Sequence, residues 1–239
     1  MLIAIDCFKR DSAGRVTVVT PYMSYSQSDK KDQPRVPITA RLLADMIEVA
    51  GADRLVTIDL HAGQIQGFYK IPGDSLTALH IICKYIRAKG LNGTVVTTDL
   101  GFAKGGRNYA EALGFPLAFI EKRRTGPTGT REALTLIGSV AGRDVLIVDD
   151  LVDTAGSVQQ AAEIVRAHGA RDVYLAFTHP VLSPPAIDRL RGLDLKEIIT
   201  TDTLPIAPQD RLPNMTILTV ADLLGEVIIR SHEGRSVGE

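Results

Sequence analysis

The chain has 239 residues, which is enough for one large domain or two small ones. Its formal net charge is −1, from 27 basic and 28 acidic residues, so no general attraction to nucleic acid or to a membrane surface is expected. No apolar run reaches membrane-spanning length. Cys7 and Cys83 lack CxxC or metal-ligand spacing, so we expect both to be core thiols in a reducing cytoplasm.

Strand and helix patterns alternate along the chain. Apolar residues at helical spacing predict helices at 2–10, 38–49, 75–89, 104–113 and 221–230, and further helices that begin at Ser157 and Ser183. In the last of these, Ser183 is expected as the N-cap and Pro184 as the first helical residue. Short apolar runs predict strands at 16–20, 55–58, 95–97, 117–120, 133–137, 145–148, 173–177, 198–200 and 215–218. This alternation predicts an α/β fold with mostly parallel sheets.

Three loops and one internal similarity complete the chain-order prediction. Loops are expected at 21–37, at 64–68 and, as a mobile Gly/Pro/Thr segment, at 125–130. A Gly-Ala pair leads into a strand and then a His at 51–61, and again at 169–179. A duplicated α/β unit and a recurring helix C-cap explain this similarity equally well.

The stretch from Val145 to Ser157 carries the strongest chemical signal. A buried strand ends in Asp149 and Asp150, Asp153 follows, and the small residues Thr154, Ala155, Gly156 and Ser157 lead into a helix. Small side chains and a helix N-terminus let backbone N–H groups approach a phosphate, while carboxylates suit sugar hydroxyls or hydrated Mg²⁺. The simpler alternative is a capped turn between a strand and a helix.

Charged residues also follow other predicted strands. They are Asp59, His61, Asp99 and the run Lys122–Arg124. Because ligands of open parallel sheets bind outside the carboxyl ends of the strands, we expect these residues on one rim. Acids and a His suit Mg²⁺ and hydroxyls, and Lys and Arg suit phosphates. The set is typical of phosphoryl-type transfer, although alone His61 is more often structural and Lys122–Arg124 a solvated turn.

These residues make the chain resemble the ribose-phosphate pyrophosphokinases, also called phosphoribosyl pyrophosphate (PRPP) synthetases. The motifs that carry the resemblance are Val148–Ser157, Asp59–Phe68, Pro34–Ile38, Glu121–Arg124 and Thr201–Pro205, in matching order along nearly the whole chain. The resemblance implies two phosphoribosyltransferase-like (Rossmann-like) domains, the first of them incomplete. The first is expected at 1–74, with a closing helix at 220–231 that packs on it, and the second at 75–219.

The resemblance also implies a reaction and its site. Diphosphate would pass from MgATP to ribose 5-phosphate, giving PRPP and AMP. Substrate-binding residues would be Asp149, Asp150, Asp153, Thr154, Ala155, Gly156 and Ser157. Lys122 and Arg124 would be catalytic, His61 and Asp99 would hold Mg²⁺, and Gln27, Ser28, Asp29 and Lys104 would contact the nucleotide. A cytoplasmic homo-oligomer, or an assembly with full-length homologues, is implied as well.

Two departures from the family pattern bear on ATP. The first part of the family's N-terminal domain has no counterpart, and an Arg-Gln pair that contacts ATP in the family is replaced by Gln27-Ser28. One charge-assisted contact contributes about 1.5–3 kcal/mol, so ATP affinity is expected to fall more than tenfold.

One alternative is therefore an ATP-deficient regulatory homologue that binds ribose phosphate without catalysis. Another is a type I phosphoribosyltransferase, against which the Gln64–Phe68 and Lys122–Arg124 segments argue.

Overall fold

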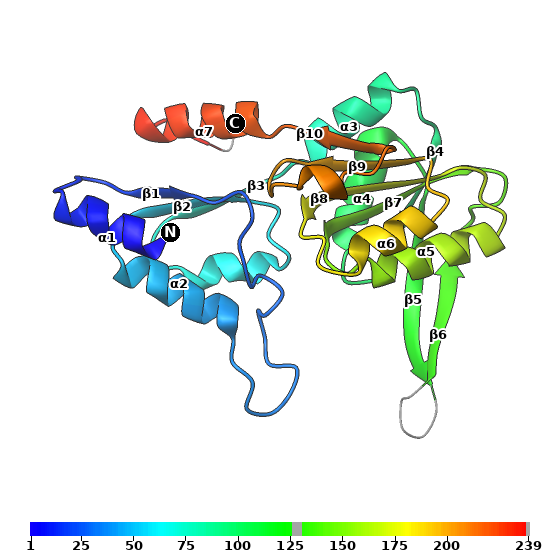
Figure 1. Ribbon diagram of the computed structural model, residues 1–239, viewed down its shortest axis with the longest axis horizontal. Helices are drawn as coiled ribbons and strands as arrows, with labels where there is room; N and C mark the ends of the chain where they lie inside the picture. The colour runs from blue at the N-terminus through cyan, green and yellow to red at the C-terminus, as the bar shows by residue number, and fades with distance from the viewer. Residues whose placement is uncertain (126–130, 238–239) are drawn as a thin grey trace. The chain divides into compact units, whose positions relative to one another are not determined.

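The computed structural model describes residues 1–125 and 131–237, and the backbone alone at 122–125 and 131–133 (Figure 1). The chain divides into two compact units. The first contains residues 1–77 and 223–239, and the second contains residues 78–222. The divisions fall after Thr77 and Asp222, whereas the sequence-based boundaries lie at 74 and 219.

The first unit is built on a small parallel sheet with strand order β1-β2-β3. The strands are β1 (Thr17–Val19), β2 (Arg54–Ile58) and β3 (Gly73–Leu76). Figure 1 shows α1 (Leu2–Arg10) and α2 (Thr39–Val49) on one side of this sheet and α7 (Ala221–His232) on the other. A 3₁₀ helix, η1 (Gly63–Phe68), follows β2.

The second unit is built on a seven-stranded sheet with order β10-β9-β8-β7-β4-β5-β6. The strands are β4 (Gly93–Thr97), β5 (Leu117–Thr125), β6 (Arg131–Ile137), β7 (Asp144–Val152), β8 (Val173–Pro180), β9 (Glu197–Thr201) and β10 (Met215–Leu218). All neighbouring pairs are parallel except the β5–β6 hairpin, which extends beyond the sheet in Figure 1. The predicted α/β class with mostly parallel sheets is confirmed.

Helices cover both faces of this larger sheet (Figure 1). They are α3 (Leu79–Ala88), α4 (Ala103–Leu113), α5 (Gly156–Ala167) and α6 (Ala186–Gly192), with a short η2 (Pro208–Asp210) before β10. α3 and α4 lie on one face, and α5 and α6 on the other (Figure 1). Strand β7 lies in the middle, and its residues 144–148 are all buried, as expected for a continuous apolar strand between two helical layers.

Several element predictions were wrong. The helix expected at 75–89 begins only at Leu79, because Gly73–Leu76 forms the edge strand β3 beside β2. That strand is half-buried and partly polar, so it lacks an apolar run. Ser183 and Pro184 do not start α6. The Pro184–Pro185 bond is cis, α6 begins at Ala186, and its N-cap is Pro185 without a side-chain cap.

Two smaller predictions also changed, and a third lies mostly outside the described residues. Residues 64–68 were expected as a loop and form most of η1. Cys7 is exposed on α1, whereas Cys83 is buried as expected, and both thiols are free. Of the mobile segment expected at 125–130, residues 126–130 lie outside the described residues.

Among the residues that the structure does describe, no helix combines the length and apolar character needed to cross a membrane.

Candidate functional site

The stretch from Val145 to Ser157 forms most of β7, the following turn and the start of α5. The strand does not stop at the acids, as the sequence suggested, but continues through Asp149 and Asp150 to Val152. It continues because Asp149 pairs with Phe177, and Leu151 with His179, on the parallel strand β8. Successive strand side chains usually point to opposite faces of the sheet, but the Asp149 and Asp150 carboxylates lie close enough to interact. Asp150 is buried, and Asp149 is half-buried.

Asp149 is held by two hydrogen bonds from residues of the second unit. The Thr98 hydroxyl donates to Oδ2 at 2.6 Å, and the Asp150 N–H donates to Oδ1 at 3.0 Å. Burial raises the pKa of Asp149 well above its usual value, the neighbouring Asp150 carboxylate raises it further, and Asp99 adds to the effect. The Thr98 hydrogen bond opposes this shift. A bound cation or sugar hydroxyls would favour the ionised form.

The turn after β7 leads directly into the N-terminus of α5. Ala155 has a left-handed backbone with φ of 60°, is buried, and serves as the N-cap of α5 without a side-chain cap. The first N–H groups of a helix have no acceptor within the helix, and the helix dipole favours negative charge there. The predicted phosphate loop, Asp153–Ser157, thus combines a helix N-terminus with small side chains.

Asp153 contributes a buried oxygen atom to the same loop. Among the residues that the structure describes, its Oδ1 has no hydrogen-bond partner. A buried acceptor without a donor costs free energy, so such an atom marks a place where a ligand donor or a water binds. The hydroxyls of a sugar are donors of this kind.

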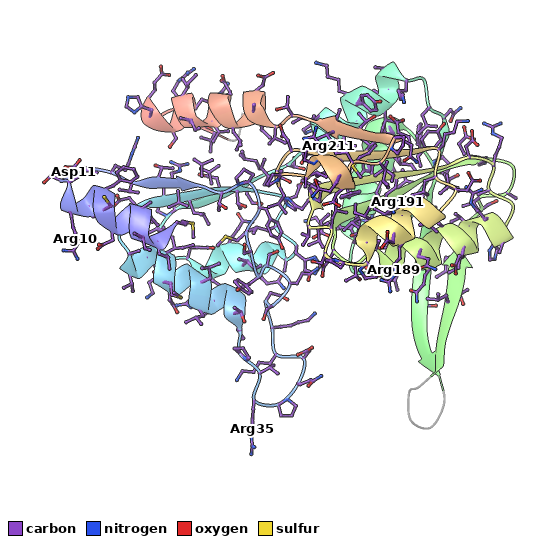
Figure 2. The ribbon with its side chains drawn as sticks, viewed as in Figure 1. Arg10, Asp11, Arg35, Arg189, Arg191 and Arg211 are labelled. Carbon is purple, nitrogen blue, oxygen red and sulfur yellow. The ribbon has the colours of Figure 1, made fainter. Side chains whose placement is uncertain are left out.

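Arg189 of α6 lies beside this loop and was not expected from the sequence. Its Nη1 donates a hydrogen bond of 2.8 Å to the carbonyl oxygen of Thr154, and Figure 2 labels it on α6. The Leu182 N–H donates to the Val152 carbonyl at 2.9 Å, so the segment before α6 also binds the end of β7. No local sequence pattern links α6 to this turn, because the contacts arise only from tertiary packing.

A buried polar network lies at the carboxyl ends of β8 and β9. The Thr178 carbonyl accepts hydrogen bonds from the hydroxyls of Thr201 at 2.7 Å and Thr203 at 3.1 Å. Thr203 Oγ1 also lies 3.0 Å from His179 Nδ1. The Thr201–Pro205 motif therefore fixes the backbone next to β7, and within the described structure its threonines serve this network.

Other predicted residues of the second unit follow β4 or lie on β5. Asp99 Oδ1 accepts the Phe102 N–H at 3.2 Å, which orients its carboxylate. Lys104 is exposed in the first turn of α4. Lys122 and Arg124 lie on β5, where their backbones pair with Leu134 and Glu132 on β6. Their side chains lie outside the described part of the chain.

The remaining predicted residues belong to the first unit. His61 is exposed between β2 and η1. Gln27 is exposed, Ser28 Oγ accepts the N–H of Thr39 at 3.3 Å at the start of α2, and the buried Asp29 accepts a hydrogen bond from Gln64 Nε2. Ser28 and Asp29 thus brace the loop before α2.

Carboxylates such as those of Asp99 and Asp149 are a donor type that Mg²⁺ prefers. Among the described residues, no three His, Cys, Asp or Glu side chains gather to hold a metal ion. Mg²⁺ is usually bound by one or two carboxylates, with waters and substrate phosphates as its other ligands. The charge of Asp99 adds to the raised pKa of Asp149, and a divalent cation bound beside these carboxylates would offset that repulsion.

Known proteins match nearly the whole chain. The family model "N-terminal domain of ribose phosphate pyrophosphokinase" matches residues 1–51, and "Phosphoribosyl synthetase-associated domain" matches residues 128–239. Ribose-phosphate pyrophosphokinase of Caldanaerobacter subterraneus is 46% identical over 241 residues, covering 100% of this chain and 76% of the relative. The chloroplastic ribose-phosphate pyrophosphokinase 1 of Arabidopsis thaliana is 44% identical over 99% of this chain and 60% of its own length. The crystal structure of phosphoribosylpyrophosphate synthetase from Mycobacterium smegmatis superimposes with a TM-score of 0.92 at 41% identity, over 98% of this chain and 76% of that one.

Proposed function

The chain belongs to the ribose-phosphate pyrophosphokinase family of enzymes, and we propose that it transfers the diphosphoryl group of MgATP to ribose 5-phosphate. In this reaction the anomeric hydroxyl oxygen attacks the β-phosphorus of ATP. The bond between the α,β-bridging oxygen and that phosphorus breaks, the hydroxyl proton is released, and AMP leaves. The products are PRPP and AMP.

The observation that carries the proposal is the β7–α5 segment. Asp149 and Asp150 lie at the end of a buried strand, and the left-handed Ala155 starts α5 directly after the buried Asp153 oxygen. We assign the hydroxyls of the ribose to Asp149 and Asp150. The 5-phosphate is assigned to the loop Asp153–Ser157, where backbone N–H groups and the helix dipole bind it.

Further residues are proposed for the nucleotide and for the transferred group. Lys104, in the first turn of α4, is proposed to bind phosphate oxygens, and Lys122 and Arg124 to neutralise the charge that develops on the transferred group. Gln27, Ser28 and Asp29 are proposed to contact ATP. Since Gln27 is uncharged and Ser28 is engaged with Thr39, we expect weaker ATP binding than an Arg in this segment would give.

Mg²⁺ is the proposed cofactor, with His61 and Asp99 as its protein partners. When bound, Mg²⁺ supplies positive charge that neutralises the ATP phosphates and the transition state. The Phe102 N–H fixes the Asp99 carboxylate, so that its other oxygen is pre-oriented. Positioning and charge neutralisation are the main contributions to this class of reaction, and no side chain needs an unusual pKa for it.

The assembly and the location are proposed as well. Leu2, Ile3, Met46, Val49 and Ala50 line a largely apolar groove between α1 and α2, which also has Asp6 and Asp45 in its lining and which we call the α1–α2 face. Ile3 is 87% exposed and Val49 is 89% exposed, which is unusual for large apolar side chains. We propose that a second copy of the chain covers this face. The two free thiols are consistent with the cytoplasm as the proposed location.

A product assay tests the reaction. The purified protein is incubated with ribose 5-phosphate and ATP, and AMP, ADP and PRPP are quantified by chromatography with and without Mg²⁺. The proposal predicts AMP and PRPP in equal amounts, abolished by EDTA and restored by excess Mg²⁺. Binding of ribose 5-phosphate by calorimetry without any AMP would contradict catalysis, and base-dependent consumption of PRPP would indicate a phosphoribosyltransferase. The comparisons give no support to the ATP-deficient alternative.

A further inference from the structure

Arg189 makes a contact to the phosphate loop that the family assignment does not explain. Its guanidinium comes from α6, and Nη1 reaches the carbonyl oxygen of Thr154 at 2.8 Å. Arg191, two residues away, instead pairs with Asp188 of the same helix at 2.8 Å and is exposed (Figure 2). One helix thus offers two arginines, one bonded to the loop and one bonded only within α6.

The hydrogen bond from Arg189 to the Thr154 carbonyl fixes the orientation of the whole peptide unit between Thr154 and Ala155. A peptide unit is planar and trans, so the C=O of Thr154 and the N–H of Ala155 point in opposite directions. With the carbonyl held toward Arg189, the Ala155 N–H is directed away from α6. It is therefore pre-oriented as one of the first donors at the N-terminus of α5.

The backbone at this position needs such support. Ala155 has φ of 60°, a left-handed conformation that residues with a Cβ adopt at a cost. The next residue leaves room for the guanidinium, since a Cβ on Gly156 would lie 3.4 Å from Arg189 Nη1. A charge-assisted hydrogen bond from Arg189 offsets the cost of the Ala155 conformation.

We propose that Arg189 is a positioning residue that holds the Thr154–Ala155 peptide in the orientation that binds the 5-phosphate of ribose 5-phosphate. This inference rests on the proposed function, because it concerns the affinity of the same loop for its phosphate. Arg189 acts through the peptide, and its cationic charge beside the loop adds to the attraction of an anion. The binding contribution is thus assigned to a residue on α6, outside the β7–α5 segment.

The test compares Arg189→Gln with Arg191→Gln, which removes the same charge from the same helix without touching the loop. Dissociation constants for ribose 5-phosphate are measured by calorimetry, and KM values for ribose 5-phosphate and ATP by kinetics. Loss of one charge-assisted hydrogen bond predicts a ten- to hundredfold rise in the dissociation constant and KM for ribose 5-phosphate, with the KM for ATP unchanged. Arg191→Gln should stay within twofold of wild type. Arg189→Lys, which keeps one donor, should recover part of the loss.

Hydrogen exchange gives a second measurement that needs no ligand. In Arg189→Gln, the amides of residues 154–158 should exchange at least tenfold faster than in wild type, while those of β7 and β8 keep their rates. Equal affinity and equal exchange in the Arg189→Gln and Arg191→Gln variants would overturn the inference. Faster exchange throughout the second unit would also overturn it, since it would show a general loss of stability. If wild type binds no ribose 5-phosphate, the proposed function fails, and the exchange experiment alone decides the role of Arg189.

Discussion

The Thr98 hydroxyl donates a 2.6 Å hydrogen bond to Asp149 Oδ2, which joins the end of β4 to β7 in the second unit. Thr98 is 1% exposed, so its hydroxyl has little access to water and is committed to this carboxylate. The bond selects one orientation of Asp149 and opposes the effect of burial on its pKa.

Replacing Thr98 therefore tests how Asp149 is oriented. Thr98→Val keeps the shape of the side chain and removes the donor, whereas Thr98→Ser keeps the donor. A hydrogen bond to a charged group contributes about 1.5–3 kcal/mol, so we expect kcat/KM for ribose 5-phosphate to fall about ten- to hundredfold in the Val variant. The Ser variant should lose less than threefold. Similar kinetics for the two variants would show that the hydroxyl is unimportant.

The raised pKa of Asp149 predicts a pH effect on stability. A carboxyl whose pKa is higher in the folded than in the unfolded state binds its proton more tightly when folded. The stabilisation of the folded state that results from this tighter binding is fully present below the usual pKa of an aspartate. It is lost as the pH rises through the raised pKa of Asp149 in the folded protein. An asparagine at position 149 does not ionise, so the Asp149→Asn variant does not lose this stabilisation at high pH. Without ligand, it should melt above wild type at pH 8, and the difference in Tm should close toward pH 4.

The size of that difference can be measured by calorimetric melting. A gain of about 1 kcal/mol corresponds to roughly 2–4 °C in Tm for a protein of this length. Asp188→Asn, at an exposed position of α6, serves as the control and should show no such trend. A variant Asp149→Asn that melts at or below wild type at pH 8 would contradict the assigned burial effect. Its activity should be severely reduced in either case.

Gly106 tests the packing that places Asp99 and Lys104. A Cβ at Gly106 of α4 would lie 2.2 Å from Thr97 Cγ2 on β4, which is closer than atoms can approach. Gly106→Ala is therefore expected to lower the free energy of unfolding by about 1–3 kcal/mol in urea titrations. Gly225→Ala is the matched control, because nothing lies within 4 Å of its Cβ position in α7 and alanine favours a helix. Equal effects at the two glycines would contradict the close packing of α4 on β4.

The α1–α2 face predicts self-association. Light scattering on a sizing column should give a mass of at least two chains for wild type at micromolar concentration. Val49→Asp adds a charge to the apolar side chains of this groove and should shift the mass toward a single chain. Ile229→Asp, at a half-exposed position on α7, should leave the mass unchanged. A monomeric wild type would contradict the proposed assembly.

Long periodic segments could be predicted from the sequence, whereas features fixed by tertiary contacts could not. The apolar run before Asp149 predicted the buried parallel strand β7, and the small residues after Asp153 predicted the turn before α5. The strand continued past the acids because backbone pairing with β8 decides where it ends, and side-chain polarity does not. Polar edge strands such as β3 have no apolar signal, since only one neighbour holds them.

The same distinction applies to the candidate site. Asp149 and Asp150 stand in a motif, so the residue types themselves indicated a sugar or metal site. Thr98 and Arg189 stand in unremarkable sequence and matter through single contacts made across the fold. The role of such a hydroxyl or guanidinium can be recognised only when the structure shows which oxygen atom it bonds to. The roles assigned to His61, Lys122 and Arg124 remain proposals.

The most direct test follows the β-phosphorus of ATP. The enzyme is incubated with Mg²⁺, ribose 5-phosphate and ATP that carries ³²P in its β-phosphate, and the products are separated. The account predicts that the label moves into PRPP and that an equal amount of unlabelled AMP is released. Label that stays in ADP, which would indicate transfer of a single phosphoryl group, would contradict it. So would intact labelled ATP in the presence of bound ribose 5-phosphate.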